Sequence, residues 1–365
     1  MVLQAASSSK FWARPARRPQ VLRKATLAIP LLLTFGATGW EPSRAADRAE
    51  GDAAQPADCL DVTPHEVTFV TVEPGVQLEV LDFGGSGETM VLLTGLGDNA
   101  HVWDGFAYQF TDDFRVIGIT RRGFGRSDQP EDGYDVRTRA RDDIEVLDHS
   151  GIGKAVFVGH SLAGSELSEL GLAHPDRVDK LVYLDAADLA ARFVFPEEPA
   201  GPPYTDDDGR SLPIYQAGSA RLEGFRRPNA AACNGFTFRP SGMIGDSVTP
   251  EVINDKLLAD VKEQRPVDWQ KIGAPRLAIF ATFSREHLLP WYWYLSDEQQ
   301  AEFDRAWPPI VEWHEDTIKR FRGHAPDHPE PIVRELPGAP HYIYISNEGF
   351  VVREMREFLL GDARD

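Results

Sequence analysis

Eight short apolar runs, several of them rich in β-branched residues, recur along the chain from Glu66 onward and predict eight strands. The predicted strands lie at residues 66–72, 76–83, 89–94, 114–120, 154–159, 178–184, 276–282 and 331–336. Apolar residues at helical spacing predict helices at 138–149, at 162–174 and after Asn347. Strands that alternate with helices are typical of an α/β architecture, in which a mostly parallel sheet is covered on both faces.

This alternation breaks after the sixth predicted strand. Residues 189–273 are rich in Pro and Gly before a helix that starts near Thr249. Because a structureless loop of that length is improbable, we expect these residues to form a lid over the carboxyl ends of the strands. The predicted core therefore comprises residues 65–188 and 274–365. In its second part, residues 296–299 form a capping box that predicts a further helix.

The first 45 residues differ in composition from the rest of the chain. A cluster of basic residues precedes an apolar run at 25–37, and small residues near Ala45 offer a cleavage site. This order is typical of a secretory signal, and the apolar run is short for a membrane span, although the sequence leaves an uncleaved anchor open. We expect residues 1–45 to be a signal peptide, residues 46–64 to form a flexible arm, and the mature protein to be periplasmic or extracellular.

The charge balance argues against nucleic-acid partners. The chain has 38 Lys and Arg residues against 57 Asp and Glu residues, and the predicted signal holds seven of the basic residues and one of the acidic ones. A mature chain this acidic repels phosphate backbones and anionic membrane surfaces. No integral membrane span is expected in the mature chain.

Cysteine usage and glycine motifs exclude several kinds of site. Only Cys59 and Cys233 occur, which is too few for a disulfide framework or a cysteine-based zinc site. In an exported chain they form either one disulfide or two buried thiols. No G-x-G-x-x-G opens a helix, and no phosphate-binding loop ends in Gly-Lys-Ser/Thr. We therefore expect neither a metal nor an organic cofactor.

The strongest candidate for chemistry is Ser161. The strand at 154–159 continues into Gly-His-Ser-Leu-Ala, and a helix follows at once. A nucleophilic serine needs this arrangement, because the tight turn strains the serine and exposes its hydroxyl, while small neighbours relieve the crowding. Gly159 and Ala163 are those small neighbours.

A serine hydroxyl also needs a base within hydrogen-bond reach and an acid that orients the base. His341 follows the last predicted strand and precedes the final helix, so it returns to the same edge of the sheet as Ser161. Asp185 ends the sixth strand and is the expected acid. Asp188 and Glu286 remain alternatives for that role.

The remaining site residues are predicted from their positions beside these groups. The oxyanion that forms during acyl transfer needs preorganised donors. We expect these to be the backbone N–H groups of Leu162, at the start of the helix, and of Leu96, in a glycine-rich turn after the third strand. Trp291 and Trp293 belong to an aromatic run that we expect to line an apolar substrate pocket.

Four segments together resemble the α/β-hydrolase superfamily, and the resemblance extends over nearly all of residues 66–360. They are residues 94–97, 120–127, 159–163 and 338–341. The resemblance implies an α/β-hydrolase fold, with an eight-stranded, mostly parallel sheet and a lid after the sixth strand.

The position of Asp185 resembles the haloalkane-dehalogenase branch of that superfamily. Ser161, however, replaces the nucleophilic aspartate of dehalogenases and epoxide hydrolases. The sequence therefore predicts a serine hydrolase that cleaves carboxylic esters of small or medium-sized substrates through an acyl-enzyme. Lactone, thioester and carbon–carbon bond hydrolysis with the same triad are alternatives. A ligand-binding sensor is the non-enzymatic alternative, and the sequence leaves the oligomeric state open.

Overall fold

The computed structural model describes residues 64–186, 236–238, 244–246, 251–282, 297–339 and 341–361. Several of the sequence-based predictions concern residues outside these ranges. They are the signal peptide, nearly all of the N-terminal arm, Cys59, Cys233, Asp188, Glu286, Trp291 and Trp293.

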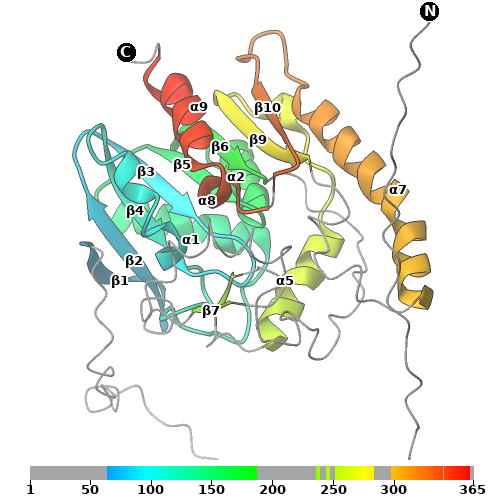
Figure 1. Ribbon diagram of the computed structural model, residues 1–365. Helices are drawn as coiled ribbons and strands as arrows, with labels where there is room; N and C mark the ends of the chain where they lie inside the picture. Colours follow the sequence, from blue (N-terminus) through cyan, green and yellow to red (C-terminus); the bar gives the residue numbers. More distant parts are fainter. Residues whose placement is uncertain are drawn as a thin grey trace, which may run out of the picture. The chain divides into compact units, whose positions relative to one another are not determined.

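An eight-stranded sheet lies at the centre of the described chain, in the order β1-β2-β4-β3-β5-β6-β9-β10 (Figure 1). The strands are β1 (Glu66–Glu73), β2 (Val76–Gly84), β3 (Glu88–Leu93), β4 (Phe114–Ile119), β5 (Ala155–His160), β6 (Val178–Leu184), β9 (Arg276–Thr282) and β10 (Ile332–Pro337). Strand β2 pairs antiparallel with β1 and β4, and every other pair is parallel. All eight predicted strands are present, with ends that differ by at most one residue. The predicted mostly parallel α/β sheet is confirmed.

Both faces of the sheet are buried under helices. On β3, Val91 and Leu93 belong to one apolar cluster, whereas Met90 and Leu92 belong to the other. A strand buried on both faces is apolar at nearly every position, which is why the apolar runs located the strands. Full burial of each such side chain contributes roughly 1.5–3 kcal/mol.

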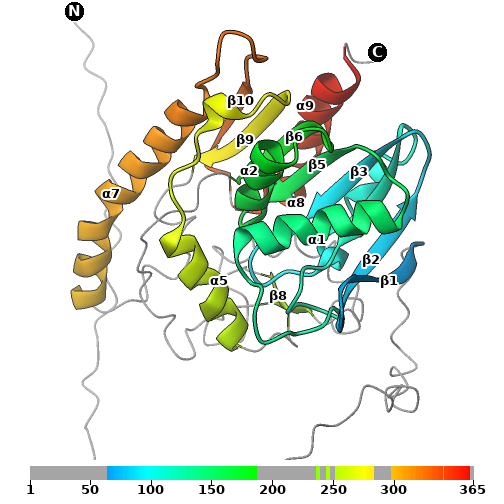
Figure 2. The same ribbon diagram turned by 180° about the vertical axis from the view of Figure 1, so that it is seen from behind.

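The covering helices divide between the two faces, as Figures 1 and 2 show from opposite sides. Helices α1 (Val136–His149) and α2 (Ala163–Ala173) contribute to the first cluster. The short turn η2 (Ala100–Trp103) and helices α8 (Ile343–Ser346) and α9 (Glu348–Leu360) contribute to the second. The sequence predicted α1, α2 and α9 but not η2 or α8.

Helix α7 (Asp297–Phe321) begins where the capping box predicts a helix. Its last turns bring Ile318 and Phe321 into the same cluster as α1 and α2. None of the helices in the described ranges is long and apolar enough to cross a membrane.

In the region predicted as a lid, the structure describes helix α5 (Glu251–Glu263) and the antiparallel strand pair β7 (Phe236–Phe238) and β8 (Ile244–Asp246). Ile253 and Leu257 of α5 pack in one apolar cluster with Phe124 and Leu162. These last two residues follow the carboxyl ends of β4 and β5, so α5 lies at this edge of the sheet. The division into core and lid stays a prediction.

Candidate active site

Ser161 occupies a strained turn between β5 and α2. Its φ is 53°, in the left-handed region that non-glycine residues seldom adopt. Its carbonyl accepts a hydrogen bond from the Gly164 N–H at 2.9 Å, which closes the first turn of the helix. A Cβ at Gly159 would lie only 2.9 Å from the Cβ of Ala163. Glycine is therefore required there, because any larger residue would push β5 away from α2.

The structure brings His341 against this serine. His341 lies between β10 and α8, and its Nε2 is 2.8 Å from the Ser161 Oγ. Its Nδ1 is 2.5 Å from the Asp185 Oδ2. The three side chains that the sequence nominated from separate segments are therefore in hydrogen-bond contact with one another.

Asp185 is fixed by the neighbouring strand β9. Its N–H donates to the Ile279 carbonyl at 2.8 Å, and its Oδ1 accepts from the Ala281 N–H at 2.8 Å. Its φ of 44° is a second strained backbone conformation in this site. These two hydrogen bonds leave Oδ2 directed at His341.

This geometry determines what the imidazole can do. An ionised carboxylate only accepts hydrogen bonds, so the proton on His341 resides on Nδ1, facing Asp185. The Nε2 lone pair then faces Ser161 and can accept the hydroxyl proton. The arrangement is suited to general-base activation of a serine nucleophile.

The turn that carries Leu96 lies in close contact with the tight turn at Ser161, which we call the elbow. A Cβ at Gly95 would lie 2.9 Å from the Asp98 Oδ2, 3.0 Å from the His160 Nδ1 and 3.3 Å from the Ser161 Cβ. Leu162 is almost fully buried, and Leu96 packs against the cluster that contains it. The role of their N–H groups as oxyanion donors stays a prediction.

His160, the residue before Ser161, makes a contact with His341 that the sequence analysis did not identify. Its Nε2 donates to the His341 carbonyl at 3.2 Å, and the two rings lie 4.5 Å apart between centroids. Burial, together with the nearby His341, lowers the pKa of His160 well below 6.5 and keeps the ring neutral. Next to it, the Tyr342 hydroxyl donates to the buried Asp98 carboxylate at 3.1 Å.

A buried ion cluster contacts the turn at residues 94–97, which we call the oxyanion turn after its predicted role, and the sequence analysis missed this cluster. Arg121 donates to the Glu166 carboxylate at 2.7 and 3.0 Å, and to the carbonyls of Thr94 at 2.8 Å and Gly95 at 3.2 Å. Arg139 lies 2.7 Å from the same Glu166. Burial by itself would raise the pKa of Glu166, but the two guanidinium groups hold it below its ordinary value. The signal in the sequence was the adjacent pair Arg121 and Arg122 in the 120–127 segment.

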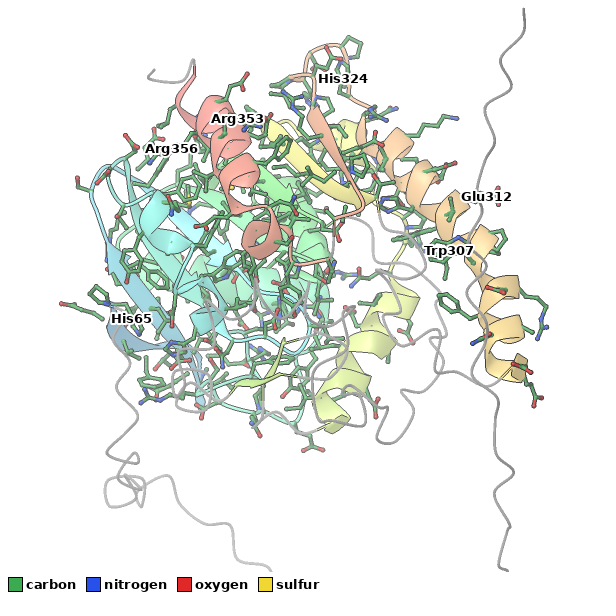
Figure 3. All side chains as sticks on the ribbon, viewed as in Figure 1. His65, Trp307, Glu312, His324, Arg353 and Arg356 are labelled. Carbon is green, nitrogen blue, oxygen red and sulfur yellow. The ribbon has the colours of Figure 1, made fainter. Side chains whose placement is uncertain are left out.

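Donors for a metal ion lie elsewhere among the described residues. His65, His101 and Asp104 bring one ligand atom each to within 4.8 Å of one another. Figure 3 labels His65 beside the start of β1. Trp291 and Trp293, the predicted pocket residues, lie outside the described ranges.

The strand order, the antiparallel β2 and the strained serine between β5 and α2 define an α/β-hydrolase fold. The model of the family described as alpha/beta hydrolase fold matches residues 88–270, and the chain belongs to this family.

An uncharacterized protein of Mycobacterium tuberculosis is 35% identical to the chain over 129 residues, which cover 34% of this chain and 36% of that protein. The bifunctional epoxide hydrolase 2 of Mus musculus is 30% identical over 172 residues, which cover 45% of this chain and 28% of that protein. The chain thus spans only about a third of the length of these relatives. A solved structure described as Est816, an N-acyl homoserine lactone degrading enzyme, has a TM-score of 0.54 at 22% identity and covers 80% of this chain and 100% of that chain. That likeness shows the fold alone.

Proposed function

We propose that the protein is a serine hydrolase that cleaves carboxylic esters through an acyl-enzyme intermediate. The observation that carries this proposal is the continuous contact from the Ser161 Oγ to the His341 Nε2 at 2.8 Å and from the His341 Nδ1 to the Asp185 Oδ2 at 2.5 Å. Membership of the α/β-hydrolase family supports it.

In the first half-reaction the Ser161 Oγ forms a bond to the ester carbonyl carbon while its proton moves to the His341 Nε2. Asp185 stabilises the resulting imidazolium, and the N–H groups of Leu96 and Leu162 bind the negatively charged oxygen. When the tetrahedral intermediate collapses, the C–O bond to the leaving alcohol breaks and His341 returns the proton to that alcohol. Water then attacks the acyl-enzyme by the same sequence of proton transfers and releases the acid.

The nucleophile distinguishes this proposal from the activity named for the mouse relative. An epoxide hydrolase that forms an alkyl-enzyme ester needs a carboxylate at the elbow, and this chain has Ser161 there. A serine alkoxide attacks carbonyl carbon readily, so esters are the substrates we propose. Lactones and thioesters present the same electrophile and belong in the substrate panel.

Labelling with a fluorophosphonate probe tests the nucleophile. We expect the wild-type protein to be labelled and Ser161→Ala to be unlabelled. Ser168→Ala is the matched control, because Ser168 lies on the same helix with its hydroxyl bonded to the Gly164 carbonyl at 2.8 Å, and we expect it to be labelled. Labelling that persists in Ser161→Ala would refute the assignment, and an unlabelled wild type would favour a ligand-binding sensor.

A panel of p-nitrophenyl esters of graded chain length, with a lactone and a thioester, tests the substrate class. Within this panel, Asp185→Asn is expected to lower kcat by about 10⁴-fold, because the amide favours the wrong imidazole tautomer. If the wild type hydrolyses lactone or thioester but no simple ester, the substrate class is wrong while the triad stands.

We also infer that the protein is exported and that residues 189–273 form a lid over this site. The basic and apolar pattern of the first 45 residues supports export. The packing of Ile253 and Leu257 beside Leu162 supports the lid. N-terminal sequencing of the protein recovered outside the cytoplasm tests the first inference, and a mature chain that still begins at Met1 would contradict cleavage.

A further inference from the structure

A second cluster of titratable side chains surrounds the turn η2. His101 lies in that turn, Asp104 directly follows it, and His65 precedes β1, where Figure 3 labels it. The Nδ1 of His101 is 3.4 Å from the Asp104 Oδ2, and the Nδ1 of His65 is 3.9 Å from the Asp104 Oδ1. Three donor-bearing side chains from two separate segments thus converge on one point.

Local structure explains why His101 and Asp104 face each other. In a 3₁₀ turn the side chains at positions i and i+3 eclipse, so these two residues stand one above the other. Asn99 fixes the start of the turn, because its side chain accepts the His101 N–H at 3.1 Å. His65 approaches from the side, with its ring 5.1 Å from the ring of His101.

A buried carboxylate lies behind His101. Glu79 of β2 is 0% exposed, and its Oε1 is 3.8 Å from the His101 Nε2. The other oxygen of Glu79 accepts from the Thr120 hydroxyl at 2.9 Å. Histidines that bind metals through one nitrogen commonly direct the other nitrogen at a carboxylate, which fixes the tautomer and the ring. Here Nδ1 faces Asp104 and Nε2 faces Glu79.

The charge and the spacing of this cluster suit a divalent ion. The carboxylates of Asp104 and Glu79 lie on opposite sides of the His101 ring, and the guanidinium of Arg126, 3.8 Å from Glu79, is largely exposed. Ligands of a tetrahedral ion with bonds of 2.0–2.1 Å lie about 3.3–3.4 Å apart. The separations of 3.4 and 3.9 Å run to different oxygens of Asp104, and one ligand atom from each residue lies within 4.8 Å of the other two. The side chains must therefore approach one another by up to about 1.4 Å to close around such an ion.

We propose that His65, His101 and Asp104 bind a divalent transition-metal ion, with zinc the best match to two imidazole nitrogens and one carboxylate oxygen. Glu79 supports His101 from the opposite side. The ion would join the segment entering β1 to the turn that follows Leu96 along the chain. The site is separate from Ser161, and its test does not depend on ester hydrolysis.

The test measures zinc binding to the chelator-treated, dialysed full chain. We expect one zinc ion per chain by elemental analysis, a rise in melting temperature on adding zinc, and cobalt absorption bands typical of four-coordinate sites. His65→Ala and Asp104→Asn are each expected to weaken zinc binding at least about tenfold, as loss of metal-site contacts commonly does. His324→Ala is the matched control, because His324 is only half-buried and bonds weakly, at 3.4 Å, to the Arg322 carbonyl.

Two results would overturn the proposal. One is substoichiometric zinc binding by folded wild-type protein, which would make the cluster an ion-pair network without a metal. The other is unchanged affinity in both folded variants, which would place the ion elsewhere. His65 is the decisive position, because it lies outside η2 and takes no part in the Asn99–His101 hydrogen bond that fixes the start of that turn, so a folded His65→Ala protein keeps the test valid.

Discussion

Replacing Arg121 with glutamine tests how the oxyanion turn is held against the elbow. The Arg121 guanidinium connects the turn, through the carbonyls of Thr94 and Gly95, to Glu166 on the helix that begins after Ser161. Glutamine is too short to reach both ends. Glu166 still keeps Arg139 at 2.7 Å, so the substitution does not leave its buried charge without a cation.

The expected magnitude follows from the two hydrogen bonds lost at the turn. Hydrogen bonds to charged groups contribute about 1.5–3 kcal/mol each to stability, but only the part that differs in the transition state affects kcat. Losing a complete oxyanion donor costs roughly 10²–10³ in kcat. A turn that keeps its donor but is less well positioned loses part of that, so we expect kcat to fall about 10- to 100-fold, or about 1.4–2.7 kcal/mol. KM should change little.

The assay is p-nitrophenyl ester hydrolysis at a temperature where each variant is folded by circular dichroism, with the fluorophosphonate labelling rate as a second measurement. Arg139→Gln is the matched control, because Arg139 shares Glu166 but does not contact the turn. We expect it to lose stability while keeping kcat within about threefold, since it removes no contact to the oxyanion site. If both variants lose kcat equally, the effect comes from general destabilisation and the reasoning about the turn is wrong.

Three further predictions concern single residues near the site. Gly95→Ala should lower kcat at least about tenfold, because the new Cβ would lie within 3.0 Å of a carboxylate oxygen and a ring nitrogen and must displace the oxyanion turn. Asp143→Asn should change the free energy of unfolding by less than about 1 kcal/mol, since burial, reinforced by neighbouring carboxylates, raises the pKa of Asp143 well above its usual value and keeps it protonated. The lowered pKa of His160 means that the unfolded chain binds this proton more readily, so stability falls as pH drops below about 6.5. In His160→Asn the slope of stability against pH should decrease by at most about 1.4 kcal/mol per pH unit in that range.

Each of these predictions has a control in the same chain. Gly105→Ala meets open space and should keep full activity. Asp142→Asn removes one partner of the buried Arg122, to which it is bonded at 2.6 and 2.7 Å, and should cost several kcal/mol by urea denaturation. His324→Asn, at a half-buried histidine, should leave the pH slope unchanged. Equal costs for Asp142→Asn and Asp143→Asn, or an unaltered slope in His160→Asn, would contradict the corresponding argument.

The sequence by itself determined the strands and the elbow. Strands buried on both faces are continuous apolar runs, so their ends could be predicted to within one residue. The turn at Ser161 is equally local, because the strain is relieved by small residues two positions away on each side. His341 and Asp185 could be nominated because parallel strands deliver their carboxyl ends to one edge of the sheet.

Only the tertiary structure decided which polar groups meet behind that edge. Arg121 contacts Glu166 across 45 residues of sequence, and His160 contacts the carbonyl of His341 across 181. No periodicity in the chain encodes such pairs, because they depend on which strands become neighbours and how deeply each side chain is buried. The same holds for His65 and the turn that carries His101. A buried charge or imidazole is stable only with a partner, and that partner is supplied by packing among distant segments.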